Sequence, residues 1–512
     1  MTRKAIPLLF HVLLLSLVAF DGRAQQAQPS ATVEELQQHL AAHVHQPKFA
    51  AALWGVKVVS LETGKVLFEE NPQKYFSPAS NSKLYTMALA LDRLGGDYRI
   101  KTSLYAKARP NRAGLLRGDL IVFGRGDSTF NARRNSNDIF RALAPLVRAV
   151  TNAGIRRIEG DLVGDESFFR GPPFGSGWAW DDMQFYYGAP ISALTINDNR
   201  LEISVKPGVQ TNAPCRLSVS PATVWIVLSN RTQTVVKGGR RSISFYRPLD
   251  QNVVFVLGKL PLDDTGYAED VTVPNPAGLF VAFFKDALAK AGVKITGKLR
   301  TANWLDRQAQ PLDCGKLVEL GFAESPPMRE LAREVQKPSQ NLYTDLLLAH
   351  VGEFKRSGEP RAAETSEDAG IRELGKFLEE AGVRRGDVQF EEGSGLSRNN
   401  LTTPNATIAL LQFMSKHREA EVYLNALPVA GVDGTLRSRM KDTAAAGNVR
   451  AKTGTLRWAN SLSGYVTSAA GERLAFCVML NRYHNTDPDR PARADVDAIA
   501  VMLAEFKGRS AP

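Results

Sequence analysis

The stretch "SPASNSKLYTMALALDRLGG", residues 77–96, carries the information on which both the fold and the chemistry depend. Its apolar residues recur at helical spacing and Gly95 ends the pattern, so the stretch predicts a helix. Ser80 and Lys83 stand three residues apart at its start, on one face of that helix. Two interpretations fit this pair: a nucleophilic serine beside its base, or an N-cap serine beside a surface lysine.

The S-x-x-K pattern alone does not decide between them, because the chain holds a second copy, Ser438-Arg439-Met440-Lys441. At ordinary residue frequencies, a chain of this length should show the pattern about once or twice by chance. The copy at Ser80 differs in its setting. Residues 51–72, "AALWGVKVVSLETGKVLFEENP", precede it and are typical of two strands joined at Thr63-Gly64.

A second element, Lys337-Pro338-Ser339-Gln340-Asn341, lies between two predicted helices. Pro338 interrupts the helical pattern, so Ser339 and Asn341 can project from a turn. The alternative is that Ser339 is a simple N-cap of the following helix. A second S-x-N sequence, Ser397-Arg398-Asn399, raises the rate of chance matches.

A third element, Lys452-Thr453-Gly454-Thr455, lies in a strand-like run. Gly454 would let a ligand approach the backbone closely. The alternative is an edge-strand lysine before a bulge. Each of the three elements is weak alone, and their order along the chain is what carries information.

The pattern of elements predicts an α/β fold with a large insertion. Two strands near the start, helices between, and three strand-like runs after residue 449 predict one domain, residues 25–98 and 271–512, built on a single antiparallel sheet flanked by helices. Residues 99–270 consist of short β-rich runs separated by Gly, Pro and Asn. They predict a mostly β insertion of two small domains.

The first 24 residues are typical of an export signal. A positively charged start and an apolar run end at Gly22-Arg23-Ala24, where small residues suit a signal peptidase. The alternative, a retained membrane anchor, needs about 20 apolar residues, and this run is shorter. We therefore expect a protein exported to the periplasm or cell envelope.

Composition and charge exclude some classes of function. The 512 residues are 44% hydrophobic and 23% charged, as in globular proteins. The formal net charge of +11 falls to about +9 without the signal, and basic residues are interspersed with acidic ones. Nucleic-acid binding is not expected, whereas weak attraction to an anionic polymer or membrane surface is.

Three cysteines do not make a disulfide framework. Cys477 lies in the apolar run "RLAFCVML" and is expected in the core. A bridge between Cys215 and Cys314 stays open in an oxidising compartment.

Together, S-x-x-K, S-x-N and K-T-G in this order resemble the signature of penicillin-binding proteins and serine β-lactamases. The 255 residues between Lys83 and Ser339 resemble one branch, the class C low-molecular-mass penicillin-binding proteins, which are D-alanyl-D-alanine carboxypeptidase/endopeptidases of peptidase family S13. Glu392 departs from the Asp usual before Gly-Ser-Gly in that family. Further similar stretches are "GDLIVFGRGDSTF" (118–130), "GWAWDDMQFYYGAPISALTINDN" (177–199), "EGSGLSRNNLTTP" (392–404) and "LPVAGVDGTLRSRM" (427–440).

The resemblance implies a role for each motif residue. Ser80 would attack the carbonyl between two D-alanines of a peptidoglycan stem peptide, with Lys83 as general base and Ser339 relaying the proton to the leaving amine. Lys452 would keep the Ser339 region electropositive and lower the pKa of Lys83. Asn341 would bind the substrate amide. Thr453 and Thr455 would bind the terminal carboxylate beside Gly454, and the backbone N–H groups of Ser80 and Thr455 would form the oxyanion hole.

The same resemblance implies a pocket for the diamino-acid side chain of the stem peptide, formed by Asp182, Tyr187, Arg398 and Leu456. Asp182 could otherwise cap a helix, and Arg398 could be a solvated loop charge. Neither metal nor cofactor is expected. β-Lactam antibiotics would act as covalent inhibitors, and the competing functions are a serine β-lactamase and a non-catalytic peptidoglycan-binding scaffold.

Overall fold

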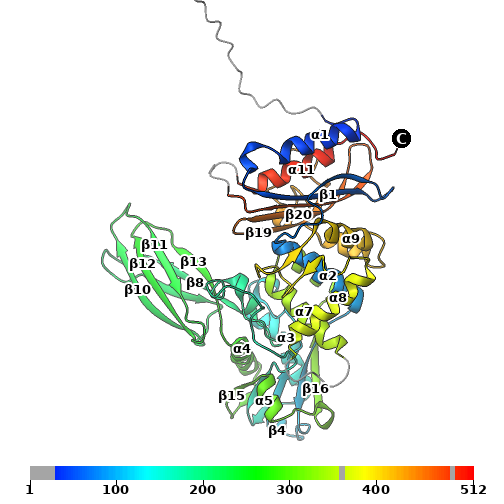
Figure 1. Ribbon diagram of the computed structural model, residues 1–512. Coiled ribbons are helices and arrows are strands. Elements are labelled where there is room, and N and C mark those ends of the chain that lie inside the picture. Colours follow the sequence, from blue (N-terminus) through cyan, green and yellow to red (C-terminus); the bar gives the residue numbers. More distant parts are fainter. Residues whose placement is uncertain (1–28, 357–363, 485–490, 512) are drawn as a thin grey trace, which may run out of the picture.

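The structure, a computed structural model, describes residues 29–356, 364–484 and 491–511. Both ends of this part contribute to one antiparallel sheet of strand order β19-β20-β21-β1-β2, labelled in the upper part of Figure 1. Its strands are β1 (Leu53–Ser60), β2 (Val66–Glu70), β19 (Arg450–Leu456), β20 (Ala459–Thr467) and β21 (Arg473–Asn481). The predicted sheet is therefore confirmed.

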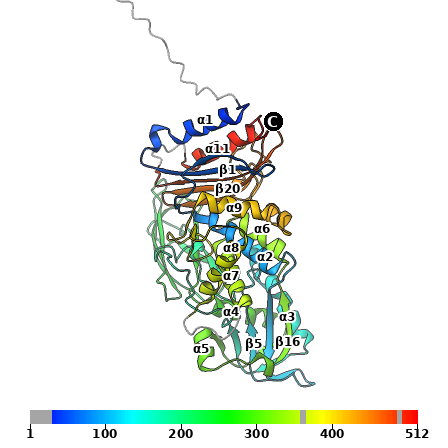
Figure 2. The ribbon, with the colours of Figure 1, turned by 45° about the vertical axis from the view of Figure 1, so that its right-hand side comes forward.

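Helices cover both faces of this sheet (Figures 1 and 2). α1 (Val33–Val44) and α11 (Arg493–Glu505) share a core with one face, and α2 (Ser82–Leu94) and α9 (Pro404–Met414) share a core with the other. The sequence of β21 is apolar throughout because both faces of the strand are buried. Phe476 and Val478 enter the first core and Cys477 the second, because successive residues of a strand point to opposite faces.

α2 is the central helix of this domain. Residues 82–91 are all buried, because other helices surround it. The helices packed around it are α6 (Met328–Gln336), α7 (Asn341–Lys355), α8 (Ser366–Glu380) and α10 (Ala420–Ala426). A two-stranded ladder, β17 (Val388–Gln389) with β18 (Leu401–Thr402), flanks the turn that closes over α2.

Two nested insertions separate α2 from α6. The outer one is an α/β unit with a five-stranded sheet, β15-β7-β5-β3-β16, and a small sheet, β14-β6-β4. Its elements are β3 (Lys101–Ala106), β4 (Leu115–Arg117), β5 (Leu120–Phe123), α3 (Ile139–Asn152), β6 (Arg157–Glu159), β7 (Leu162–Asp165), α4 (Pro276–Lys290), β14 (Lys294–Ile295), β15 (Leu299–Ala302), α5 (Trp304–Ala309) and β16 (Val318–Glu324).

The inner insertion, between β7 and α4, is the all-β arm that projects to the left in Figure 1. It consists of two three-stranded sheets, β13-β8-β9 and β10-β12-β11. The strands are β8 (Arg200–Lys206), β9 (Arg216–Ser220), β10 (Val227–Val235), β11 (Ser242–Tyr246), β12 (Val253–Pro261) and β13 (Tyr267–Thr272).

The second boundary of the insertion differs from the predicted residue 270. α4 shares its core with α3 and the arm, and β16 pairs with β3 over residues 318–324 and 101–106. Residues 276–324, which the sequence placed in the catalytic domain, thus pack within the insertion. We propose a domain division near residue 325, with one α/β and one all-β unit before it.

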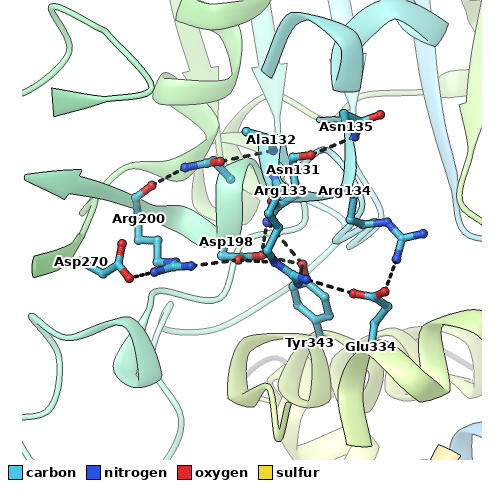
Figure 3. Close-up of polar contacts among 11 residues, drawn as sticks. Asn131, Ala132, Arg133, Arg134, Asn135, Asp198, Arg200, Asp270, Glu334 and Tyr343 are labelled. Carbon is cyan, nitrogen blue, oxygen red and sulfur yellow. Dashed lines mark hydrogen bonds and ion pairs between the residues drawn. The ribbon is translucent and has the colours of Figure 1, made fainter. Parts of the chain in front are cut away.

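A polar network fastens the outer insertion to the catalytic helices (Figure 3). Arg133 donates to Asp198 Oδ2 at 3.2 Å, to Glu334 Oε2 at 3.1 Å and to the hydroxyl of Tyr343 at 2.8 Å. Tyr343 in turn donates to Asp198 Oδ1 over 2.5 Å. Because Tyr343 lies two residues after Asn341, the network fixes the start of α7, where the S-x-N element ends.

The remaining sequence predictions concern cysteines and membrane segments. All three cysteines are free: Cys215 and Cys477 are buried and Cys314 is partly exposed, so the bridge between Cys215 and Cys314 is not formed. Among the described residues, no helix has the length and hydropathy needed to cross a bilayer. The predicted signal, residues 1–24, lies outside the described residues.

Candidate active site

Ser80 lies in a 3-10 turn, Ala79–Asn81, directly before α2 rather than within the helix itself. Ala79 takes a φ of +48° to make this turn. Ser461 of β20 holds it in place: its hydroxyl donates to Pro78 O over 2.7 Å and accepts a hydrogen bond from the Asn81 side chain. The turn leaves the Ser80 side chain half-buried, above the first turn of α2.

Lys83 is fully buried, and its ammonium group is surrounded by three acceptors. Nζ lies 3.0 Å from Ser80 Oγ, 2.6 Å from Asn341 Oδ1 and 2.5 Å from Ser394 O. An amide oxygen and a carbonyl can only accept hydrogen bonds. In the neutral amine both N–H groups therefore serve those two partners, and the lone pair faces the hydroxyl of Ser80.

Burial suits Lys83 for losing its proton. Burial lowers the pKa of Lys83 from 10.5 to about 8, although the carboxyl groups of Asp345 and Glu392 oppose the shift. A general base is most effective when its pKa lies near the working pH. The lysine is thus placed and tuned to accept a proton from Ser80.

The S-x-N element occupies the break between α6 and α7, as predicted. Ser339 has a φ of +64°, and α7 begins at Asn341 with no side-chain cap, so Ser339 is not its N-cap. Its hydroxyl accepts a hydrogen bond from Lys452 Nζ over 2.8 Å. Asn341 holds Lys83 with its Oδ1 and donates from Nδ2 to Tyr187 O over 2.9 Å.

The K-T-G element lies on β19, at the edge of the sheet beside the Ser80 turn. Lys452 is fully buried and also donates to Thr453 O over 2.8 Å. Burial and the charges of Lys83 and Arg439 hold its pKa well below the usual range. Gly454 is required by the protein's own packing rather than by a ligand, because a Cβ atom there would lie 2.4 Å from Pro78 O.

These residues line one cleft of about 440 Å³ between the catalytic domain and the insertion. The predicted site residues line this cleft, except for the buried residues Lys83, Lys452 and Gly454. The lining consists of Ser80, Asp182, Tyr186, Tyr187, Pro338, Ser339, Asn341, Gly395, Leu396, Arg398, Thr435, Thr453, Thr455, Leu456 and Arg457. Lys83 and Lys452 lie buried beneath this wall.

The outer end of the cleft brings together the four residues predicted for the diamino-acid pocket. Partial burial and the neighbouring Asp181 raise the pKa of Asp182, and Arg398 and Tyr187 oppose the shift. Burial and Asp182 raise the pKa of Tyr187 to about 12. Arg398 is exposed, and its guanidinium donates to Arg457 O over 3.5 Å.

The serine and lysine of the duplicate S-x-x-K and the serine and asparagine of the duplicate S-x-N do not line this cleft, although Arg398 within the second duplicate does. Ser438 and Lys441 are exposed in a turn. Ser397 and Asn399 instead hydrogen-bond to Glu391, at 3.2 and 2.9 Å. Identical patterns therefore acquire different surroundings from the rest of the fold.

Sequence reasoning missed three contributors to the site. Thr435 accepts a hydrogen bond from Thr453 Oγ1 over 2.8 Å at the cleft wall. Asp345 and Glu392 are buried carboxyl groups whose charges act on Lys83. Thr435 and Glu392 lie in the family-like runs 427–440 and 392–404, which could have indicated them. Asp345 lies one helical turn after Asn341, and this position could have indicated it.

Known proteins resemble this chain over almost its whole length. The D-Ala-D-Ala carboxypeptidase 3 (S13) family profile matches residues 36–505. A D-alanyl-D-alanine carboxypeptidase of Actinomadura sp. is 33% identical, over 100% of this chain and 92% of that protein. The D-alanyl-D-alanine carboxypeptidase DacB of Haemophilus influenzae is 27% identical, over 84% of this chain and 85% of that protein.

Solved structures agree in fold. The crystal structure of penicillin-binding protein 4 from Haemophilus influenzae has a TM-score of 0.76 and 25% identity, over 92% of this chain and 98% of that one. A second structure of that protein, in complex with a β-lactam, has a TM-score of 0.71 and 24% identity, over the same 92% and 98%. With the family match and the identity to the Actinomadura enzyme, the chain belongs to the D-Ala-D-Ala carboxypeptidase 3 (S13) family of serine peptidases.

Proposed function

We propose that this protein hydrolyses D-alanyl bonds of peptidoglycan stem peptides, as a carboxypeptidase, an endopeptidase or both, through an acyl-enzyme on Ser80. The observation that carries this proposal is the 3.0 Å contact between Lys83 Nζ and Ser80 Oγ, with the other two N–H directions of the lysine occupied by acceptors. Family membership supports the same reaction.

In the acylation step, neutral Lys83 takes the proton of Ser80 as Oγ attacks the carbonyl carbon of the penultimate D-alanine. The oxyanion is stabilised by the backbone N–H groups of Ser80 and Thr455. The proximity of β19 to the Ser80 turn supports this pairing, since a Cβ on Gly454 would lie 3.1 Å from Ser80 N.

Collapse of the intermediate breaks the peptide C–N bond and leaves an ester on Ser80. Lys83 gives its proton to Ser339, and Ser339 gives its own to the leaving amine. Water then attacks the ester while Lys83 accepts a proton from it, and Ser80 regains its hydrogen. Apart from this water, every proton in the sequence moves between the substrate and side chains of the protein.

The two ends of the cleft suit the two ends of a stem peptide. Thr453 and Thr455 lie beside buried Lys452 and would bind the terminal carboxylate, and the second N–H of Asn341 Nδ2 would bind the peptide carbonyl. At the other end, Asp182 and Arg398 carry opposite charges, matching the amine and carboxylate of a diamino-acid side chain. Tyr187 and Leu456 would contact its methylene groups.

We further propose that the protein is exported, with residues 1–24 as the signal, and that β-lactams acylate Ser80. Penicillin-binding protein 4 of Haemophilus influenzae has been solved with a β-lactam. The net positive charge supports weak attraction to anionic envelope polymers or membrane surfaces.

Incubation with cross-linked muropeptides followed by mass analysis tests the proposal. Release of D-alanine from pentapeptides, or separation of cross-linked dimers, is the expected result, and Ser80→Ala should abolish it. Ser438→Ala, the serine of the duplicate motif, is the matched control and should keep full activity.

Two outcomes would favour the competing functions. Rapid turnover of penicillin with no muropeptide cleavage would indicate a β-lactamase. Neither cleavage nor labelling by a fluorescent penicillin, in protein that is folded, would indicate a non-catalytic scaffold.

A further inference from the structure

The turn that begins at Glu392 is built around one buried carboxylate. Glu392 is fully buried, and six donors point at its two oxygens. The backbone N–H groups of Ser394 and Gly395 lie at 2.8 and 2.7 Å, and the Asn400 side chain at 2.8 Å. The remaining donors are Ser394 Oγ, Ser397 N and Trp178 Nε1.

The same turn is in direct contact with the nucleophile and its base. The carbonyl of Ser394 accepts a hydrogen bond from Lys83 Nζ. Gly395 has a φ of +82°, and a Cβ atom there would lie 1.9 Å from Ala79 O in the Ser80 turn. A change in the conformation of the Glu392 turn would therefore displace both Ser80 and Lys83.

A second buried carboxyl group, Asp345 on α7, provides a contrast. Its Oδ1 accepts a hydrogen bond from Gly393 N at 3.0 Å, and its Oδ2 has no partner among the described residues. Burial disfavours the ionised form of a carboxyl group unless donors compensate, and Asp345 has a single donor in the part of the chain that the structure describes. Burial and the charge of Glu392 accordingly raise the pKa of Asp345 well above the usual range.

The geometry points to Glu392 as a positioning residue for Lys83: it orders the turn whose Ser394 carbonyl accepts a hydrogen bond from Nζ, and it brings an acidic side chain to that turn. This inference rests on the proposed role of Lys83 as general base. It assigns the function of a residue outside the three motifs.

Other charged groups also face this region. Lys452 on β19 lies near enough to Lys83 for the two charges to interact, and Arg439 acts on Lys452. Glu367 on α8 acts on Asp345. Among the hydrogen bonds of the described residues, none of these groups bonds to the Ser394 carbonyl, whereas Glu392 orders the turn that carries it.

The test is the pH dependence of acylation by penicillin, measured from about pH 6 to about pH 10 as a second-order rate constant. The rate should rise as Lys83 loses its proton. In Glu392→Gln the rising limb should move to lower pH by about 1 unit, because an opposite charge that stabilised the ammonium is gone. Glu392→Asp should keep the limb within about 0.3 unit, since it retains the charge.

A purely structural role would lower the plateau in Glu392→Gln and leave the limb in place, which would overturn the inference. If Glu392→Gln does not fold, Glu392→Asp decides, because a displaced limb in a variant that keeps its charge would contradict the assignment. Lys83→Met separates the proposed role of Lys83 from the proposed role of Glu392. Acylation at the wild-type rate in that variant would refute the proposed base itself, whereas loss of acylation with an unmoved limb in Glu392→Gln would refute only the role of Glu392.

Discussion

Two fully buried lysines, Lys83 and Lys452, lie beneath the wall of the cleft, and their surroundings differ in charge. Lys83 is acted on by the carboxyl groups of Asp345 and Glu392, which raise its pKa against the effect of burial. The charged groups acting on Lys452 are cations, Lys83 and Arg439, which lower its pKa further. Burial is common to both, so the difference lies in the neighbours.

This difference teaches which lysine carries out which task. The pKa of Lys83 near 8 suits repeated gain and loss of a proton beside Ser80. Lys452 has no ion-pair partner among the described residues and donates to Ser339 Oγ and Thr453 O. A substrate carboxylate at Thr453 and Thr455 would supply that counter-charge, so Lys452 is suited to recognition.

The largest effect should come from removing the base. Lys83→Met should reduce the rate of acylation by penicillin about 10³-fold or more, since a positioned general base contributes about 10²- to 10⁴-fold. The rate constants are measured by labelling with a fluorescent penicillin. Lys441→Met, at the lysine of the duplicate motif, should acylate at the wild-type rate, and an equal loss in both variants would contradict the assignment.

A smaller effect should appear in stability. The unfolded chain holds the proton of Lys83 up to its ordinary pKa of 10.5, whereas the folded chain releases it near 8. Unfolding therefore takes up a proton between these pH values, and the free energy of unfolding of the wild type should rise with pH relative to Lys83→Met. The total gain is about 3 kcal/mol.

Denaturant unfolding between about pH 7 and about pH 10 measures this difference. Below the folded pKa the two proteins should differ by a constant amount. Parallel curves over the whole range would mean that Lys83 titrates normally in the folded state, and the contrast with Lys452 would then lose its basis.

The sequence predicted the central sheet because two strand patterns stand before the helices and three stand after them. It also predicted the three elements that meet in the cleft. It placed the end of the insertion wrongly, because the helical spacing of residues 276–290 does not say which core receives the helix. Phe280 and Phe284 are buried against the insertion, and only tertiary packing decides this.

The surroundings of the motif residues were equally beyond sequence reasoning. Asp345 and Glu392 lie 262 and 309 positions after Lys83 in the chain. Their effect on it depends on the burial that folding creates. Gly454 was expected to admit a ligand, yet its contact is with Pro78 O. Motif order identified the reacting groups, whereas their pKa values and hydrogen bonds arise from contacts distant in sequence.

The smallest of the three effects should separate recognition from proton transfer. Lys452→Met should lower kcat/KM about 30-fold for a peptide with a free C-terminal carboxylate, because a hydrogen bond to a charged group is worth about 2 kcal/mol. For the same peptide with an amidated C-terminus, already a poor substrate, the variant and the wild type should be nearly equal. Lys83→Met should instead reduce the rates on both peptides alike. An equal loss on both peptides in Lys452→Met would show that this lysine, too, serves the proton transfer, and the division of roles between the two buried lysines would fail.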